Sequence, residues 1–448
     1  MSGKVNKYDE MACKYGDPWI WGIYLTLVIL SIIESYTASS REVATAGVYM
    51  PMVMQGAFLS FGFVIMYVIY RVDYNNKLLM ATLIMGLGAA TFFSLVWLQV
   101  GGMDINGAKR AIKLVFFTFQ PAELAKLSIV TLLAWIYSRN QKSEDVKWSG
   151  LLISVFVIAL FSVFLIQGGL TNTLLFMSIS GTMMVLCGAK WKKLLALFGM
   201  FAVLALVFLL IKQAGDKKVE NMEQSRANTE LVSDSQQQTS SGDHFAPRLR
   251  GSTWQSRIKD WMDNDSLVNR PITSDNQQKM FSRIAQAHGG LYGVGIGNSR
   301  ECSRLPLAFS DYIFSIIVEE TGFIGGMVVL LLYLWLLARA LMIVRRRSHR
   351  VLPSLLIIGV ACMIVFQALF HMAINVGVFP VSGQPLPLIS KGGTSILVTS
   401  AAFGIMLSVS RTLARQENGG IKTNKEREAE ERQNAEQKVN ESLKNEWK

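Results

Sequence analysis

Charged residues and cysteines are scarce in this sequence. Asp, Glu, Lys and Arg make up 17% of its 448 residues, whereas 51% are hydrophobic. A soluble globular chain normally carries more charge, so this balance indicates a protein that crosses a membrane several times. The four cysteines have no metal-ligand spacing, and only Cys302 falls clearly on the predicted outer side. We therefore expect no metal site and no internal disulfide.

Internal repeats and a concentrated basic surface are also missing. No repeat is strong enough to suggest a repeat-built transporter. The formal net charge of +12 comes from basic residues scattered among loops, which argues against a nucleic-acid partner. The same charge fits attraction to the anionic headgroups of membrane lipids.

Long apolar segments dominate what is present, and ten of them could cross a bilayer, which requires about 20 residues each. They lie near 19–38, 50–70, 78–98, 116–137, 149–166, 170–188, 193–212, 312–344, 352–374 and 393–413. The predicted fold class is an all-α polytopic membrane protein of about ten helices. A large extracytoplasmic loop separates helices 7 and 8.

Lysine and arginine in the loops predict the orientation. Fifteen lie in the inner segments if the N-terminus is cytoplasmic: Lys4, Lys7, Lys14, Arg71, Lys77, Arg139, Lys142, Lys147, Lys190, Lys192, Lys193, Arg345, Arg346, Arg347 and Arg350. Five lie in short outer loops: Arg41, Lys109, Arg110, Lys113 and Lys391. This bias places both termini in the cytoplasm.

The predicted organisation has five parts. They are a cytoplasmic segment (1–18), helices 1–7 (19–212), a periplasmic loop (213–310), helices 8–10 (311–415) and a charged cytoplasmic tail (416–448). Within the loop, 215–243 is polar and lacks aromatic residues, so we expect disorder there. The tail is either a solvated arm or a docking segment for a partner.

Ionisable and polar residues of the predicted helices gather in the outer leaflet. They are Glu34, Glu123, Lys126, Glu319, Glu320, Gln367, His371 and Asn375, with Asp311 at the outer end of helix 8. Charged groups in a bilayer cost several kcal/mol each, so they normally face a cavity or one another. The pattern predicts one polar cavity that opens to the outer leaflet.

Each of these residues also has a structural interpretation. Glu123 and Lys126 are three residues apart on one helix face and could simply pair. Asp311 could be an N-terminal helix cap, and His371 a hydrogen-bonded core histidine. At about 100° per residue, Glu319 can share the side of Asp311, whereas Glu320 points to another helix.

Two glycine-rich stretches differ in what they indicate. GGLYGVGIGNS at 289–299 follows no strand and opens no βαβ unit, so it is not a dinucleotide-binding motif. KGGTS at 391–395 opens a helix, whose exposed N–H groups could hold a phosphate. The residues of this second stretch are Lys391, Gly392, Gly393, Thr394 and Ser395.

Three motifs resemble those of the SEDS family (shape, elongation, division and sporulation), the FtsW/RodA/SpoVE glycosyltransferases. They are NGAKR with FQPAELAKL, HGGLYGVGIGNS with LPLAFSDYIFSIIVEETGFIGG, and NVGVFPVSGQPLPLISKGGTS. The resemblance runs over roughly residues 15–415 in order and topology. GNS at 297–299 favours the FtsW-like division branch over the RodA-like elongation branch.

The chain departs from the family pattern in four places. QGGLTNT at 167–173 has no acid where the family usually has a Pro-Asp turn, and 215–243 looks like an insertion. Lys391 replaces an aromatic or apolar residue, and Ala111 stands where Trp is common. None of these positions belongs to the Asp311 segment.

The resemblance implies an enzyme that polymerises lipid II at the outer face of a bacterial inner membrane. Asp311 would act as the base, and the reaction would invert the anomeric centre. Lys126 (held by Glu123), Arg110, Lys109, Lys391 and the GGTS amides would bind the leaving undecaprenyl pyrophosphate. Asn375, Glu319 and His371 complete the predicted substrate-binding set. We expect no resident cofactor, and a divalent cation accompanying the pyrophosphate stays open.

Two other functions remain open from the sequence. A lipid II flippase would need polar groups through the inner half of the membrane as well, and a division-machinery scaffold would need no chemistry. Family resemblance implies a class B penicillin-binding transpeptidase and other divisome membrane proteins as partners, besides lipid II and membrane lipids.

Overall fold

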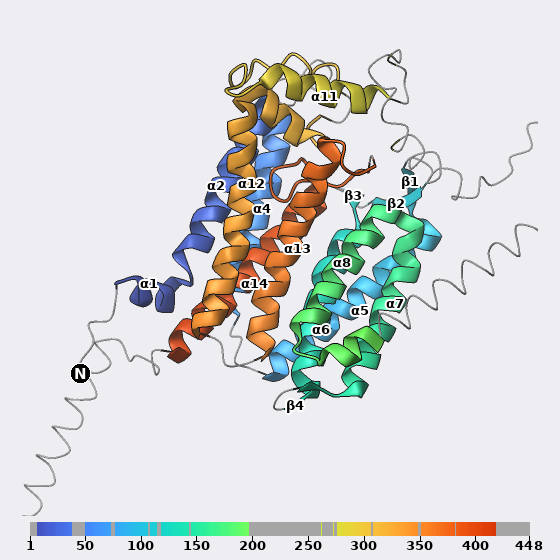
Figure 1. The fold of residues 1–448 in the computed structure, drawn as a ribbon, viewed down its shortest axis with the longest axis vertical. Helices are drawn as coiled ribbons and strands as arrows, with labels where there is room; N and C mark the ends of the chain where they lie inside the picture. Colours follow the sequence, from blue (N-terminus) through green and yellow to red (C-terminus); the bar gives the residue numbers. More distant parts are fainter. Residues whose placement is uncertain are drawn as a thin grey trace, which may run out of the picture.

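A helical bundle makes up most of the structure, a computed structural model (Figure 1). It describes residues 7–37, 50–72, 77–105, 108–113, 118–142, 145–196, 261, 272, 276–305, 308–347, 351–380 and 382–417. The long helices are α2 (Pro18–Thr37), α4 (Met50–Arg71), α5 (Lys77–Gly101), α6 (Pro121–Asn140), α7 (Trp148–Gly168), α8 (Leu170–Leu186), α12 (Ile313–Arg347), α13 (Val351–Asn375) and α14 (Gly393–Glu417).

These helices confirm the predicted helical, polytopic fold class. Within the described residues, seven helices are long and apolar enough to cross a membrane, and α8 is a shorter apolar helix. The predicted segment 193–212 lies almost entirely outside the described residues, as do 215–243 and most of the tail. The count of ten helices therefore stays a prediction.

Burial separates central helices from peripheral ones. In α13 and α14, 78% and 83% of the residues in the 18-residue apolar stretch are buried, against 22% in each of α4 and α5. A helix that is apolar on all sides is stable only inside a bundle or against lipid. The central helices therefore hold the polar side chains away from lipid, whereas α4 and α5 present much of their surface outward.

Short strands occur where only helix and loop were predicted. β1 (Met103–Ile105), β2 (Ala108–Lys113) and β3 (Thr118–Phe119) form an antiparallel sheet, and β4 (Gln141–Lys142) pairs with β5 (Asp145–Val146). The predicted helix from 116 therefore starts too early, because β3 covers Thr118–Phe119 and α6 begins at Pro121. Proline suits the first helical position, where its missing N–H costs no hydrogen bond.

A break in α12 is the main departure from the predicted continuous helix at 312–344. Gly322 has φ 74° and ψ −176°, which interrupts the helix. The segment 290–295 inserts there: Val294 N–H donates to the Glu319 carbonyl (3.0 Å) and Phe323 N–H to the Gly290 carbonyl (2.9 Å). A Cβ atom on Gly293 would collide with the backbone of α12, so the motif at 289–299 is a packing device.

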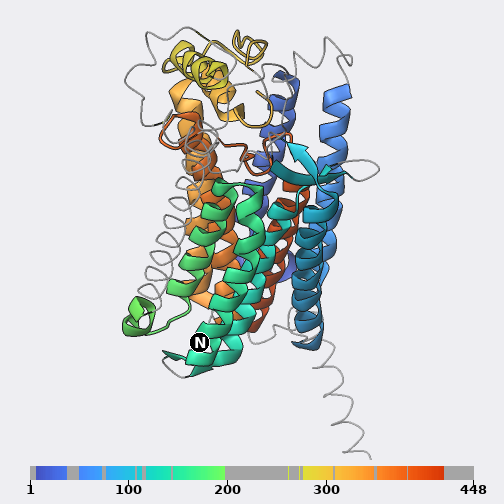
Figure 2. The same cartoon turned by 90° about the vertical axis from the view of Figure 1, so that its right-hand side faces the viewer.

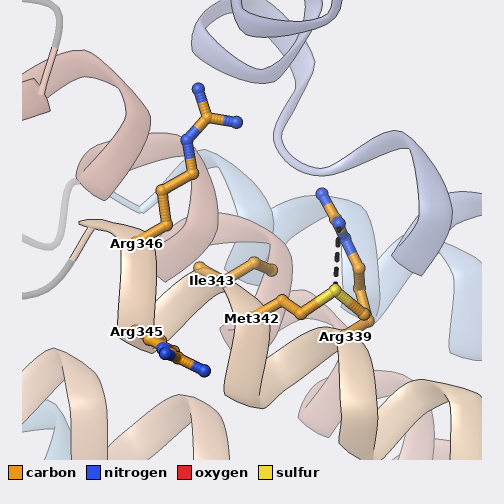
Figure 3. A pocket seen from close by; sticks show the side chains of 5 residues that line it. All are labelled: Arg339, Met342, Ile343, Arg345 and Arg346. Atoms are coloured by element: carbon orange, nitrogen blue, oxygen red, sulfur yellow. Dashed lines mark hydrogen bonds between the residues drawn. The ribbon is translucent and has the colours of Figure 1, made fainter.

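The two ends of the bundle carry different structures. The sheet β1–β3 and α11 (Gln277–Gly289) lie at one end, which the sequence predicts to be the outer end (Figure 2). At the other end α1 (Lys7–Tyr15) packs on α14, and Arg339 of α12 pairs with Asp17 at 2.7 Å. Figure 3 shows that Arg339, Arg345 and Arg346, which line a pocket there, point in different directions and do not converge on one anion.

Candidate active site

Asp311 lies in a turn immediately before α12, at the predicted outer end of the bundle, and its side chain is partly buried. The Ser310 hydroxyl donates to Asp311 Oδ1 at 2.6 Å. A Cβ atom on Gly383 would lie 3.0 Å from Asp311 Oδ2, so the carboxylate faces the loop between α13 and α14. Burial raises the pKa of the Asp311 carboxyl, and the Ser310 hydroxyl and the Arg110 guanidinium oppose part of that rise.

The loop between α13 and α14 is fastened to the Asp311 turn. Lys391 N–H donates to the Phe309 carbonyl (2.9 Å), and the Ser390 hydroxyl donates to the Ser310 carbonyl (2.7 Å). The ammonium of Lys391 lies 4.9 Å from the centre of the Phe309 ring. The KGGTS stretch and the SDYIF stretch, about 80 residues apart in the sequence, therefore form one local structure.

Asn375 holds the Asp311 turn in place from the outer end of α13. Its Nδ2 donates to the carbonyls of Asp311 (3.1 Å) and His371 (2.9 Å). Its Oδ1 accepts from the backbone N–H (3.2 Å) and the hydroxyl (2.9 Å) of Ser315. Every polar atom of this buried amide is used inside the protein. Asn375 was predicted to bind substrate, and its contacts instead suit it to position the turn.

Glu123 and Lys126 form the ion pair that their spacing predicts, with 2.7 Å between Lys126 Nζ and Glu123 Oε1. Gln367 of α13 accepts from Lys126 Nζ at 2.6 Å and donates to the Pro385 carbonyl at 3.1 Å. Lys126 is 1% exposed. The pair therefore supports the loop that faces Asp311, and it reaches the site through Gln367 and Pro385.

The basic residues of β2 point to different places. Arg110 Nε donates to the Gly168 carbonyl at 2.9 Å, and its guanidinium lies close enough to Asp311 to act on that carboxyl. Lys109 Nζ donates to the Gln99 carbonyl at 2.7 Å, at the outer end of α5. Of these two residues, Arg110 is thus the one joined electrostatically to the Asp311 site.

Thr394 and Ser395 at the start of α14 also have protein partners. The Thr394 hydroxyl donates to the Thr118 carbonyl at 3.0 Å, and it accepts from Gln120 N–H at 3.2 Å. Gln367 Nε2 donates to Ser395 Oγ at 3.4 Å. Both side chains therefore fasten α14 to its neighbours. The Gly392 N–H donates to the Ser390 carbonyl at 2.9 Å, so a phosphate seat would have to use Lys391 and the N–H groups at the start of α14, from Gly393 onward.

Glu319 is placed differently from its prediction. Its carboxylate accepts from the Ser299 hydroxyl (2.5 Å) and from Arg300 N–H (3.0 Å), so it fastens the outer loop to α12. Among the described residues, no hydrogen bond or ion pair joins it to Asp311. The prediction that Glu319 shares the side of Asp311 assumed one helix through both residues. Asp311 instead lies in a turn, and α12 begins only at Ile313. Glu320, predicted to contact another helix, lies close enough to the buried Glu34 of α2 for the two carboxyl groups to interact electrostatically.

His371 has the contacts of a hydrogen-bonded core histidine. Its buried ring donates from Nδ1 to the Gln384 carbonyl at 2.6 Å, because a carbonyl can only accept. The Gln384 side chain donates to Asn172 Oδ1 at 2.6 Å. Asn172 belongs to the stretch that lacks the usual family acid. This chain of contacts ties α8 and α13 to the loop opposite Asp311.

Two residues at this site were missed by the sequence analysis, Ser282 and Gln286 of α11. The Gln286 amide donates to the carbonyl of Asn375 at 2.8 Å and to Ser315 Oγ at 2.9 Å. The apolar positions Phe281 and Ala285 are four apart and predict a packed helix here. Nothing in the sequence shows which helix it packs on.

The described side chains do not form a metal-binding cluster. Within the described ranges, no group of three or more His, Cys, Asp or Glu residues could hold a metal ion. A divalent cation held mainly by a bound pyrophosphate stays a prediction.

Comparisons with known proteins identify the family of this chain. The family model FtsW/RodA/SpoVE, described as "Cell cycle protein", matches residues 18–415. A relative from Xanthomonas oryzae pv. oryzae, "Probable peptidoglycan glycosyltransferase FtsW", is 28% identical over 428 residues, covering 93% of this chain and 77% of the relative. An Enterococcus hirae relative of the same name is 28% identical over 415 residues, covering 89% and 93%.

Solved structures share the fold. The chain from "Structural coordination of polymerization and crosslinking by a peptidoglycan synthase complex" matches with a TM-score of 0.62 and 22% identity, covering 89% of this chain and 98% of its own. Rod shape determining protein RodA from Thermus thermophilus matches with a TM-score of 0.57 and 21% identity, covering 89% and 97%. The chain is therefore a multi-pass membrane protein that belongs to the FtsW/RodA/SpoVE family, in its FtsW branch.

Proposed function

We propose that this protein is a peptidoglycan glycosyltransferase that polymerises lipid II during cell division. The observation that carries the proposal is the Asp311 carboxylate, which faces Gly383, is hydrogen-bonded by Ser310 and interacts with Arg110. A carboxylate of raised pKa beside a cation is suited to accept a proton from a sugar hydroxyl. Relatives named as peptidoglycan glycosyltransferases along nearly the whole chain supply the substrate class.

In the proposed reaction Asp311 takes the proton of the acceptor 4-hydroxyl. The oxygen attacks the anomeric carbon of a second lipid-linked sugar, and the bond to undecaprenyl pyrophosphate breaks. An α-linked donor gives a β-linked product, so the reaction inverts and needs one base without a covalent intermediate. Arg110, Lys391 and the N-terminus of α14 are suited to the negative charge on the departing pyrophosphate.

Lys126 and Glu123 have an indirect part in this proposal. Because Lys126 Nζ is held by Glu123 and Gln367, a direct contact with pyrophosphate would require this buried set to open. Its proposed role in the closed form is to keep Gln367 against the Pro385 carbonyl, which fixes the loop opposite Asp311.

The proposed setting is the bacterial inner membrane, with both termini in the cytoplasm and the Asp311 site at the periplasmic face. The proposed partner is a single-pass class B penicillin-binding transpeptidase. It is supported by the structural likeness to a chain of a solved peptidoglycan synthase complex. Other division proteins would bind through surfaces that are not yet assigned.

The test is glycan-strand formation by the full chain, co-purified with its transpeptidase partner and supplied with lipid II. We expect strands on a gel from the unaltered protein and none from Asp311→Asn, which keeps the side-chain shape. Asp145→Asn, at the opposite end of the bundle, is the matched control and should retain activity. Strands from Asp311→Asn at the unaltered rate would remove Asp311 as the base. If both proteins make no strands yet move labelled lipid II across vesicles, the protein is a flippase.

A further inference from the structure

The outer-loop helix α11 is joined by hydrogen bonds to the turn that carries Asp311. Two bundle atoms, the Asn375 carbonyl and Ser315 Oγ, each lie within hydrogen-bond reach of two α11 side chains. Gln286 Nε2 donates to the Asn375 carbonyl (2.8 Å) and to Ser315 Oγ (2.9 Å). The Ser282 hydroxyl lies 2.7 Å from Ser315 Oγ and 3.2 Å from the Asn375 carbonyl. These bonds cross between a helix of the loop and two helices of the bundle.

The same two bundle residues hold Asp311. Asn375 donates to the Asp311 carbonyl at 3.1 Å. Ser315 follows Asp311 by four residues and lies in the first turn of α12. Ser282, Ser315 and Asn375 are buried, with at most 2% of each exposed, whereas Gln286 is partly exposed. The network therefore reaches the surface at Gln286. Hydrogen bonds in such a buried network support one another, and an unsatisfied member costs more than a typical bond contributes.

We propose that Gln286 is a positioning residue for glycan synthesis, because it orients Asn375 and Ser315 and through them the carboxylate of Asp311. Ser282 assists from one turn earlier on α11. The loop helix thus belongs to the active-site support and is more than a cover over the bundle. Gln286 itself touches neither substrate nor reacting atoms. The inference rests on the proposed role of Asp311 as the base.

The chemistry of the amide explains why this position needs glutamine. The carbonyl of Asn375 can only accept, and Ser315 Oγ already donates to Asn375 Oδ1, so it accepts from Gln286. One NH₂ group supplies both hydrogens. Methionine has nearly the same length and helix propensity but no N–H donor. Gln286→Met therefore removes the two bonds while keeping the bulk of the side chain.

Gln278→Met is the matched control. Gln278 lies two turns before Gln286 on the same helix, and its side chain makes no hydrogen bond to another described residue. Both variants and Ser282→Ala are compared as full-length chains with the transpeptidase partner. The readouts are the initial rate of strand formation against lipid II concentration and the thermal unfolding midpoint. These readouts separate kcat, KM and folding.

For Gln286→Met we expect kcat to fall roughly tenfold with KM unchanged within about twofold, since a displacement of about 1 Å at a reacting group can cost about 10²-fold. Ser282→Ala should lower kcat less, and the double variant should lose less than the product of the two effects. Gln278→Met should match the unaltered protein. The unfolding midpoint of Gln286→Met should fall by a few degrees, because two buried acceptors lose a donor, and the variant should stay folded at the assay temperature.

Two results would overturn the inference. One is a kcat for Gln286→Met equal to that of Gln278→Met. The other is a fall in apparent kcat no larger than the fall in the folded fraction at the assay temperature, because lost folded protein lowers the apparent kcat and leaves KM unchanged. Activity of Asp311→Asn separates this failure from that of the proposed function. If Asp311→Asn is inactive while Gln286→Met is normal, only the positioning role fails.

Discussion

Asn375 donates a hydrogen bond from its side-chain amide to the backbone carbonyl of Asp311, at 3.1 Å, across the ends of α13 and α12. The two residues are 64 positions apart in the sequence. The bond gives the Asp311 turn a fixed position relative to the central helix of the bundle. Asn375 also caps α12 from another helix, because its Oδ1 accepts from the N–H of Ser315, the third residue of α12.

Replacing Asn375 by alanine should lower both stability and activity. The change removes the donor to the Asp311 carbonyl and one of two acceptors of the Ser315 N–H, which also donates to the Tyr312 carbonyl at 3.0 Å. An unsatisfied buried group costs about 1–3 kcal/mol, so thermal unfolding of Asn375→Ala should shift down by several degrees. Gln278→Ala, at a side chain that makes no hydrogen bond to another described residue, should change neither the unfolding midpoint nor strand formation. Normal activity of Asn375→Ala would show that the Asp311 turn keeps its conformation without Asn375.

The ion pair of Glu123 and Lys126 should respond differently to single and double changes. Lys126→Met leaves a buried carboxylate uncompensated, which costs about 3–5 kcal/mol, whereas adding Glu123→Gln removes that charge. We expect the double variant to unfold at a higher temperature than Lys126→Met, as measured by thermal unfolding. Strand formation should stay low in both variants, because Gln367 has lost the ammonium that orients it. Full activity in the double variant would mean that the pair serves folding alone.

Gly322 should not tolerate alanine. Its φ of 74° disfavours an L side chain, and a Cβ atom would meet the backbone of Leu291 and Gly293. Gly322→Ala should therefore destabilise the chain by about 1–3 kcal/mol or more. Gly181→Ala is the control, since Gly181 lies inside α8 with no atom within 4 Å of an added Cβ. That change should raise stability by about 0.5–1 kcal/mol. Equal unfolding midpoints for the two variants would contradict the inserted-segment geometry.

The pH dependence of strand formation should reflect the environment of Asp311. Burial raises the pKa of the Asp311 carboxyl above 3.8, and the reaction needs the carboxylate. The kcat should therefore rise with pH along an acid limb of the pH–rate profile that lies above 3.8. Arg110→Ala removes a cation that lowers the pKa of Asp311, so the limb should move to higher pH. Lys113→Ala, on the exposed side of the same strand, should leave the limb in place. A limb that moves down in Arg110→Ala would contradict the assigned contact.

Stability should follow the opposite course over the same pH range. The folded chain binds the Asp311 proton more tightly than the unfolded chain, because the folded-state pKa is the higher one. The contribution of this group is therefore most favourable below the unfolded pKa and is lost as the pH rises through the folded pKa. Asp311→Asn should remove that part of the pH dependence, as measured by unfolding midpoints across the limb.

Local patterns in the sequence were enough for the features that depend on neighbouring residues. The apolar segments predicted the long helices, and the spacing of Glu123 and Lys126 predicted their ion pair. These features follow from helical geometry within one or two turns. The motifs around Asp311, KGGTS and HGGLYG indicated the family for the same reason, since each is a continuous stretch of chain.

Packing between distant segments settled the rest. The cap from Asn375 to the Asp311 turn, the bonds from Gln286 to Asn375, and the insertion of 290–295 into α12 each join segments far apart in the chain. Glu319 shows the consequence most directly, because its direction depends on where α12 begins and on which turn lies beside it. Periodicity tells which side chains share a face of one helix, and only the folded bundle brings a particular partner to that face.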